Sequence, residues 1–327
     1  MFPETRLRRL RNNKQIREML DISPPYPNKF IWPTFVVPGK NIKEPIKSMP
    51  GQYRYSVDML VNDLGKIVES GIGGVLLFGS TEEENKNAHG HASFDQDGVV
   101  QQAIHKIKEK YSSFTVIADI CVCAFTDHGH CGTLDKDKLV NNDETLVTLS
   151  SMAKSMCDAG VDIVAPSSMM DGQVHAIREK LDSNNYENKI IMSYSTKFAS
   201  SLYDPFRDAE NSQPSSGDRK AYQASYANLD LALRESEFDE DEGADILMVK
   251  PALFYLDVLS KIKASTDLPV AAYNVSGEYS MIHATHMQGW GSLKEMVHES
   301  LISTVRAGAD ILICLLYTSD AADEEDS

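Results

Sequence analysis

Short apolar runs rich in Val and Ile recur along the chain and alternate with segments of helical periodicity. Runs that are nearly continuous in apolar character are typical of parallel strands covered on both faces. They span residues 30–38, 73–79, 115–122, 161–167, 189–195, 245–251, 269–276 and 310–316. A strand–helix alternation repeated eight times predicts an α/β protein with a closed (β/α)8 TIM barrel.

The segments between the runs favour the same architecture. Residues 57–71, 144–160 and 293–308 carry apolar side chains at helical spacing, and each segment ends in Gly, which often terminates a helix. A doubly wound open sheet is the alternative, but its first turn carries a glycine fingerprint that opens a helix. The stretch GIGGVLLFG precedes or lies within a strand, so we discount that alternative.

The chain of 327 residues divides into three expected parts. A basic N-terminal arm, residues 1–30, precedes a catalytic barrel domain, residues 31–316. From Cys314 onward the sequence resembles translated adapter sequence, and residues 317–327 contain five acids and no base. We expect this last segment to be non-native and disordered, and the arm to dock on another subunit of an otherwise acidic protein.

Charge and cysteine content limit the partners and the compartment. The formal net charge of −16 argues against nucleic acid, whose binding needs a basic surface. The chain has no uncharged apolar run of about 18 residues, so a membrane span is excluded. Five cysteines in a chain of this size do not suggest a secreted disulfide framework, and the first residues lack the apolar region of a secretory signal. We therefore predict a cytoplasmic protein.

Functional side chains of such a barrel gather at the carboxyl ends of the strands. Polar and aromatic residues stand at these positions in several of the expected strands. They are Phe78, Asp119, Cys121, Cys123, Ser167, Tyr194, Lys197, Lys250 and Ser276. The sequence thus predicts one site at one end of the barrel.

The stretch CVCAFTDHGHC holds three of the five cysteines. Cys121 and Cys123 occupy alternate strand positions, so their side chains point the same way, and Cys131 returns from a Gly-containing loop. Three thiolates suit zinc and leave a fourth position for water or substrate, whereas His128 or His130 would close the site and make it structural. The competing interpretation is three buried free cysteines that act as small apolar groups.

Two lysines stand at the ends of expected strands that are consecutive in the chain: Lys250 closes the strand at 245–251, and Lys197 lies two residues past the strand at 189–195. At a strand spacing of about 4.8 Å their ammonium groups would repel, which lowers each pKa and frees an amine to attack a carbonyl. Two surface lysines in salt bridges are the competing interpretation. The long loop after Lys197 is a candidate lid with Arg207, Arg219 and Gln223, and its arginines suit the capture of carboxylates.

Six motifs, in this order, resemble the porphobilinogen synthase (delta-aminolevulinic acid dehydratase) family. They are CVCAFTDHGHCG, APSSMMDGQV, MSYSTKFASSLYDPFR, GDRKAYQ, MVKPA and VSGEYSMI. The resemblance extends from RLRRLR to GADILI, and the three cysteines match the zinc-dependent type. It implies a lyase of tetrapyrrole (heme) biosynthesis that condenses two molecules of 5-aminolevulinate to porphobilinogen with loss of two waters.

The resemblance also implies a role for individual residues. Lys250 forms a Schiff base with the first substrate and Lys197 with the second, while Asp119 lies beside the zinc ligands Cys121, Cys123 and Cys131. The other matches are Arg207, Arg219 and Gln223 for the second substrate's carboxylate, Ser276 for the first, and Glu235 for an allosteric magnesium ion. Tyr194 and Phe78 are expected to support the site.

Two further expectations follow from the resemblance. The N-terminal arm matches an arm that embraces a neighbouring subunit, which implies a homo-octamer. The family places a tyrosine at position 315, where this chain has Leu, and its final helix is missing here. The rival interpretations are a class I aldolase with one Schiff-base lysine, a zinc hydrolase, and a barrel that serves only as an assembly scaffold.

Overall fold

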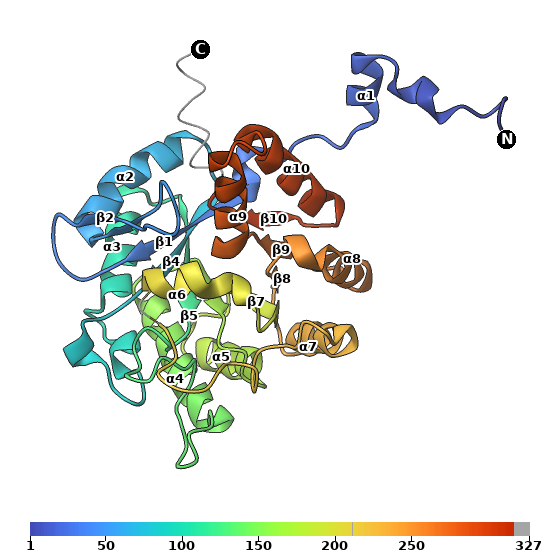
Figure 1. Cartoon of the computed structure of the whole chain (residues 1–327). Coiled ribbons are helices and arrows are strands. Elements are labelled where there is room, and N and C mark those ends of the chain that lie inside the picture. Colours follow the sequence, from blue (N-terminus) through green and yellow to red (C-terminus); the bar gives the residue numbers. More distant parts are fainter. Residues whose placement is uncertain (211, 317–327) are drawn as a thin grey trace.

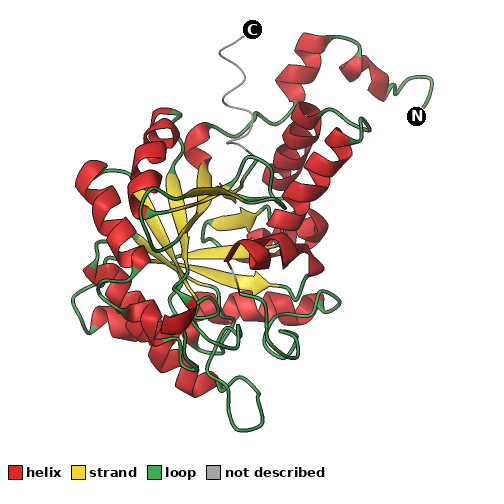
Figure 2. Ribbon diagram, turned by 60° about the vertical axis from the view of Figure 1, so that its left-hand side comes forward, coloured by secondary structure: helices red, strands yellow, loops and turns green. Residues whose placement is uncertain are grey.

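A closed barrel of parallel strands, surrounded by helices, forms the body of the molecule (Figures 1 and 2). The computed structural model describes residues 1–210 and 212–316. Neighbouring strands pair in chain order, and the last strand closes the barrel against the first at Phe30↔Leu312. The barrel strands are β1 Phe30–Val36, β4 Gly74–Gly79, β5 Thr115–Ile120, β6 Ile163–Pro166, β7 Ile190–Lys197, β8 Ile246–Lys250, β9 Val270–Tyr273 and β10 Ile311–Ile313. The predicted (β/α)8 barrel is confirmed.

Burial on both faces explains why the strands are continuous apolar runs. Every residue of β4 and of β8 is buried, and the consecutive Val75, Leu76 and Leu77 have no exposed surface. One face of each strand lies toward the barrel interior and the other toward the helices. Alternation of polar and apolar residues is therefore absent from β4 and β8.

Helices cover the outside of the barrel. They are α2 Val57–Glu69, α3 Val99–Lys110, α4 Asn142–Asp158, α5 Gln173–Asp182, α7 Leu229–Asp241, α8 Leu256–Ser265, α9 Ser276–Met287 and α10 Leu293–Arg306. The short helix α6, Asp204–Glu210, lies instead over the carboxyl ends of the strands. The expected helices in the three segments that end in Gly correspond to α2, α4 and α10. Gly160 and Gly308 follow the last two with φ of +101° and +116°, a conformation that other residues rarely adopt, which is why these helices end in Gly.

A short antiparallel ribbon extends one end of the barrel. It consists of β2 Lys43–Pro45 and β3 Tyr53–Tyr55, and β3 pairs with the end of β1 at Phe35↔Arg54. The ribbon thus extends the sheet beside the carboxyl end of β1.

Three expected strand positions differ from the structure. β5 ends at Ile120, so Cys121 and Cys123 follow the strand and do not belong to it. β7 continues to Lys197, which pairs with Lys250 in β8 beyond a register shift between Ser193 and Thr196. Ser276 is the first residue of α9 and not a strand residue.

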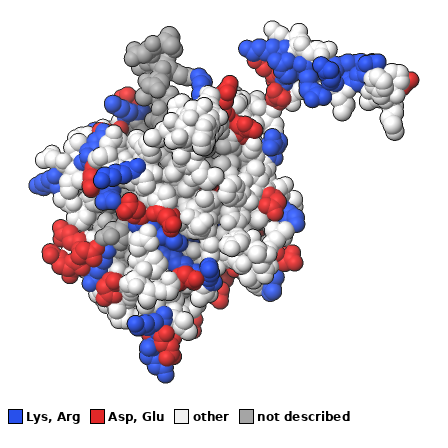
Figure 3. Space-filling model, in the orientation of Figure 1, with Lys and Arg blue, Asp and Glu red and all other residues white. Residues whose placement is uncertain are grey.

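The N-terminal arm has no buried residue before Phe30. It contains a 3-10 helix, Leu7–Arg11, and α1, Lys14–Leu20, and it extends away from the barrel (Figure 1). Basic side chains gather on it (Figure 3). It also exposes large apolar side chains, which the sequence pattern did not lead us to expect: Leu7, Leu10, Ile16, Met19, Leu20 and Ile22.

Beyond β10, Cys314, Leu315 and Leu316 are buried, and the Cys314 amide donates to the carbonyl of Ile31 at 3.2 Å. These residues complete the barrel wall. The predicted tail, residues 317–327, lies outside the described residues. Among the residues that the structure describes, no helix combines the length and the apolar character that crossing a membrane requires.

Candidate active site

A small cavity of about 20 Å³ lies at the carboxyl ends of the barrel strands. Nine residues predicted from the sequence line it: Phe78, Asp119, Cys121, Cys123, Ser167, Lys197, Arg207, Arg219 and Lys250. Its volume holds about one water molecule. A larger groove of about 840 Å³, beside α2 and α3, contains none of the predicted residues. We place the site in the small cavity because the groups capable of chemistry converge there.

Lys197 and Lys250 end neighbouring strands and pair directly in the register of β7 and β8. Their side chains are only 6% and 4% exposed. The Lys197 ammonium donates to the carbonyl oxygen of Ser167 at 2.7 Å. In the described part of the chain, neither ammonium has a carboxylate within the 4.0 Å of an ion pair. The alternative of two surface lysines in salt bridges is therefore wrong.

Aromatic rings enclose the Lys250 amine, which lies 4.0 Å from the ring centre of Tyr273 and 5.0 Å from that of Tyr194. Burial, reinforced by repulsion from Lys197, lowers the pKa of Lys250 from 10.5 to about 7. A large fraction of this amine is therefore uncharged at neutral pH. The arrangement suits a nucleophilic amine.

Asp119, in β5, is buried beside these lysines. Burial raises its pKa to about 6, although the positive charge of Lys197 acts in the opposite direction. Among the described residues, its Oδ1 and the hydroxyl of Tyr194 have no hydrogen-bond partner. Tyr194 does not line the cavity, but its ring packs under both amines, with centre distances of 5.6 Å to Lys197 and 5.0 Å to Lys250.

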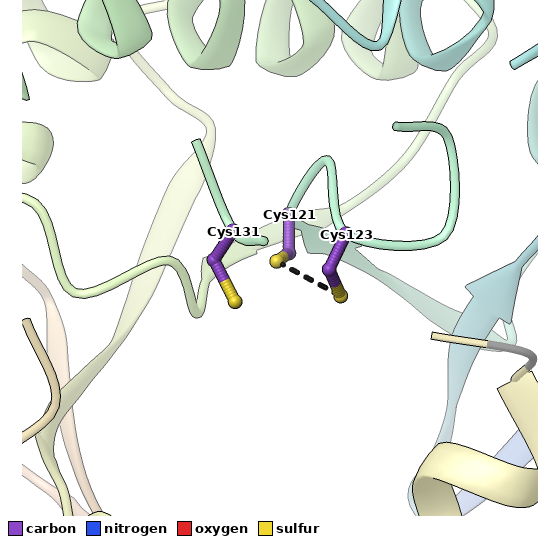
Figure 4. Close-up of side chains that lie close together, drawn as sticks. All are labelled: Cys121, Cys123 and Cys131. Carbon is purple, nitrogen blue, oxygen red and sulfur yellow. Dashed lines mark hydrogen bonds between the residues drawn. The ribbon is translucent and has the colours of Figure 1, made fainter. Parts of the chain in front are cut away.

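The three cysteines of the predicted metal site meet next to the cavity (Figure 4). The sulfurs of Cys121, Cys123 and Cys131 lie within 4.8 Å of one another, and the Cys121–Cys123 distance is 3.4 Å. All three are buried, unoxidised and separate from the main apolar core. Hydrogen bonds from Cys121 and Cys123 lower the pKa of Cys131 well below its ordinary value. The cluster thus favours a thiolate and fits a thiophilic cation better than a purely apolar role.

Neither predicted histidine joins this cluster. The His130 ring contacts the hydroxyl of Tyr222 at 3.2 Å and the carbonyl of Ser216 at 2.9 Å. The His128 ring contacts the carbonyl of Ala88 at 3.1 Å. Among the described residues, the group of possible ligands contains the three cysteines alone. Neither histidine therefore closes the predicted site.

The loop after β7 covers the cavity, as the prediction of a lid requires. Arg207, in α6, lines the cavity and pairs with Asp204 at 3.2 Å. Arg219 is buried and donates to the carbonyls of Gly129 and Ser212 at 2.9 and 2.7 Å. Burial lowers the pKa of Arg219, but the nearby thiols of Cys131 and Cys123 outweigh it and raise the pKa above its ordinary value. Both arginines keep a positive charge above the site.

Gln223 and Ser276 do not line the cavity. The side-chain amide of Gln223 is buried and has no hydrogen-bond partner among the described residues. The Ser276 hydroxyl accepts from the amide of Phe206 at 3.1 Å and donates to the carbonyl of Leu202 at 3.3 Å. In this closed arrangement Ser276 holds the start of the lid helix α6.

Glu235 belongs to a different cavity, of about 290 Å³, with Asp171, Asp239 and Glu242. Burial, followed by repulsion from Asp239, raises the pKa of Glu235 to about 7. Burial likewise raises the pKa of Asp239 to about 7. Glu235 does not line the cavity that holds Lys197 and Lys250.

Sequence reasoning missed three residues of the cavity, Tyr203, Phe206 and Glu210. Glu210 lies at the end of α6, and the Cys123 thiol donates to its Oε2 at 3.6 Å. Burial raises the pKa of Glu210 to about 7. Nothing in the sequence distinguishes it from the other 47 acidic residues of a chain that has 48, because only the fold of the lid turns it inward.

Comparisons with known proteins agree with this geometry. The family model described as delta-aminolevulinic acid dehydratase matches residues 4–323. The dehydratase of that name from Methanothermus sociabilis is 49% identical over 312 residues, 95% of this chain and 96% of its own. The one from Bacillus subtilis is 48% identical over 317 residues, 97% of each chain.

A solved structure is similar as well. It is the crystal structure of delta-aminolevulinic acid dehydratase (porphobilinogen synthase) from Toxoplasma gondii ME49 in complex with the reaction product porphobilinogen. It matches with a TM-score of 0.94 and 41% identity, over 98% of this chain and 91% of that one. The matches cover nearly the whole chain and include the segment that holds the lysines and the cysteines. The chain therefore belongs to the delta-aminolevulinic acid dehydratase family.

Proposed function

We propose that the chain is a porphobilinogen synthase, a lyase that condenses two molecules of 5-aminolevulinate to porphobilinogen with loss of two waters, in tetrapyrrole (heme) biosynthesis. The observation that carries the proposal is the pairing of Lys197 with Lys250 in one closed cavity beside three thiols. Two carbonyl substrates call for two amines. A single-lysine aldolase, a hydrolase or a scaffold has no use for both.

Each amine attacks the ketone of one substrate and forms a Schiff base, and one water leaves. Lys250 takes the first substrate, because its pKa of about 7 supplies the free amine at neutral pH. Lys197 takes the second, and its amine is aimed by the hydrogen bond to the Ser167 carbonyl. Asp119, whose pKa burial raises to about 6, exchanges protons beside both lysines.

Zinc is the metal that we propose for Cys121, Cys123 and Cys131, since three thiol donors with one free position suit it. When bound, zinc supplies a Lewis acid that polarises a substrate oxygen and acidifies water. Magnesium is proposed for the cavity of Glu235, whose carboxylate oxygens are the donors that this ion prefers. It would act there as an allosteric activator.

Substrate carboxylates would bind at the lid and at the start of α9. Arg207 and Arg219 offer forked donors to the second substrate, and the side-chain amide of Gln223, which has no hydrogen-bond partner in the described part of the chain, joins them after a small movement. Ser276 would serve the first substrate once α6 releases its hydroxyl. A cavity of about 20 Å³ cannot hold even one substrate, so the lid opens during each cycle.

The protein would act as a cytoplasmic homo-octamer. The exposed apolar side chains and basic residues of the arm support docking on a neighbouring acidic barrel. All five cysteines are free thiols, which supports a reducing compartment.

The experiment that tests the function is an assay of porphobilinogen formation from 5-aminolevulinate by the purified chain. We expect activity that a chelator abolishes and zinc restores. The variant Cys123→Ala/Cys131→Ala should stay inactive with zinc, whereas Cys157→Ala, at a buried thiol of α4, serves as the matched control. Full activity of the double variant in metal-free buffer would refute the metal's role, and absence of porphobilinogen from the zinc-loaded chain would refute the function.

A further inference from the structure

Glu210 is a buried carboxylate for which the proposed reaction has no task. It is the last residue of α6 and is 6% exposed. It lines the cavity together with the two cysteines Cys121 and Cys123. In the described part of the chain no Lys or Arg lies within 4.0 Å of it, so it is not half of a buried salt bridge. A carboxylate in such a place is costly unless it has a partner.

The distance to Cys123 identifies that partner. The Glu210 Oε2 lies 3.6 Å from the sulfur of Cys123. In a tetrahedral zinc site with Zn–S of about 2.3 Å and Zn–O of about 2.1 Å, a sulfur and an oxygen ligand are about 3.6 Å apart. The oxygen therefore lies at the separation expected of two ligands of one ion. It is not yet within 4.8 Å of every sulfur, so it must turn further toward Cys121 and Cys131.

The lid carries Glu210, and the lid is closed. The amide of Phe206, four residues earlier in α6, donates to Ser276, which pins the helix over the cavity. The closed cavity of about 20 Å³ is too small for substrate, and α6 supplies Phe206, Arg207 and Glu210 to its lining. If α6 moves away to admit substrate, it carries Glu210 away from the sulfurs.

We propose that Glu210, carried by the lid, is a fourth ligand of the bound metal. It occupies the fourth coordination position while no substrate is bound and leaves that position when substrate opens the lid. The inference rests on the proposed function for the identity of the metal and of the substrate. It adds a way in which the metal and the lid stabilise each other, since binding at the three thiols favours the closed lid. Arg219, buried beside the cysteines, offsets part of the added negative charge.

The test is metal affinity, measured on the substrate-free full chain by chelator competition with Zn²⁺. We expect Glu210→Ala and Glu210→Gln to bind zinc at least about 10-fold more weakly, because loss of even an outer-shell partner of a metal site typically costs about 10- to 100-fold in affinity. Asp208→Asn is the matched control, since it removes an exposed carboxylate from the same helix and should leave the affinity unchanged. Loading with Co²⁺ gives a second readout, because replacement of the carboxylate should shift the visible spectrum.

Catalysis gives an independent readout at saturating zinc. The variants should show a lower KM for 5-aminolevulinate, because substrate no longer displaces a ligand. Zinc affinity and a cobalt spectrum of Glu210→Gln equal to those of the wild type would overturn the proposal. The zinc affinity and the cobalt spectrum are both measured without turnover. Failure of the proposed function would therefore be seen separately, as the absence of porphobilinogen. Melting temperatures of the metal-free variants check folding, and the nearly isosteric Gln variant keeps the test valid if the Ala variant unfolds.

Discussion

Replacing Lys197 with Met should raise the pKa of Lys250 and so slow its reaction with substrate at neutral pH. Burial is the largest cause of the low pKa of Lys250, about 7, and repulsion from Lys197 is the next. Two like charges about 5 Å apart repel by about 3 kcal/mol at an effective dielectric constant of about 20, equivalent to roughly two pKa units. Nearby carboxylates offset part of this, so we expect a rise of about one to two units.

The rise translates into a loss of free amine. With a pKa of about 7, about half of the Lys250 side chains are uncharged at pH 7, against roughly one in 2,500 for an ordinary lysine. A rise of one to two units lowers that fraction about 5- to 50-fold at pH 7. Reductive trapping with 5-aminolevulinate and borohydride, followed by peptide mass mapping over a pH series, measures the fraction. The midpoint for Lys250 should move toward higher pH in Lys197→Met.

The control is Lys261→Met, at an exposed lysine of α8, which should leave the midpoint where it is. An unchanged midpoint in Lys197→Met would show that burial alone sets the pKa and that the pairing has no electrostatic role. Trapping at neither Lys197 nor Lys250 in the wild type would remove the Schiff-base mechanism altogether. In the wild type Lys250 should be labelled more than Lys197.

Three further predictions concern the arm, position 315 and the acidic cavity. Deletion of residues 1–30 should give smaller oligomers by light scattering, and an unchanged mass would contradict the role of the arm. Leu315→Tyr should tighten substrate binding about 10- to 150-fold, the value of a hydrogen bond of about 1.5–3 kcal/mol to a charged group; equal saturation by substrate would show that Leu315 is harmless. The raised pKa of Glu235, about 7, means that the stability of the metal-free protein falls as pH rises from about 4.5 to 7 and this carboxyl group ionises. The ionised carboxylates bind Mg²⁺ better, so Mg²⁺ should raise the melting temperature most above pH 7. Glu235→Gln should lose this response and the exposed Glu237→Gln should keep it; an equal response in both would refute the magnesium site.

The local pattern of the chain was sufficient to predict the barrel. The strand that ends at Lys250 and the strand that contains Val75 are apolar throughout because both faces are buried, and this property is visible in a window of a few residues. Parallel strands in a barrel place their carboxyl ends together, so Lys197, Lys250 and the cysteines could be assigned to one site before any contact was known. The family resemblance then assigned their roles.

The sequence alone thus determined the order of strands and helices, the closed barrel, and the side chains that its strand ends bring together, since all of these follow from local periodicity and from general rules of topology. Only the tertiary structure decided that Ser276 holds the lid, that His130 turns to Tyr222 and away from the sulfurs, and that Glu210 faces Cys123. Glu210 and Cys123 are 87 residues apart. Contacts of this kind depend on how a long loop packs over the barrel, and no short window of sequence contains that information.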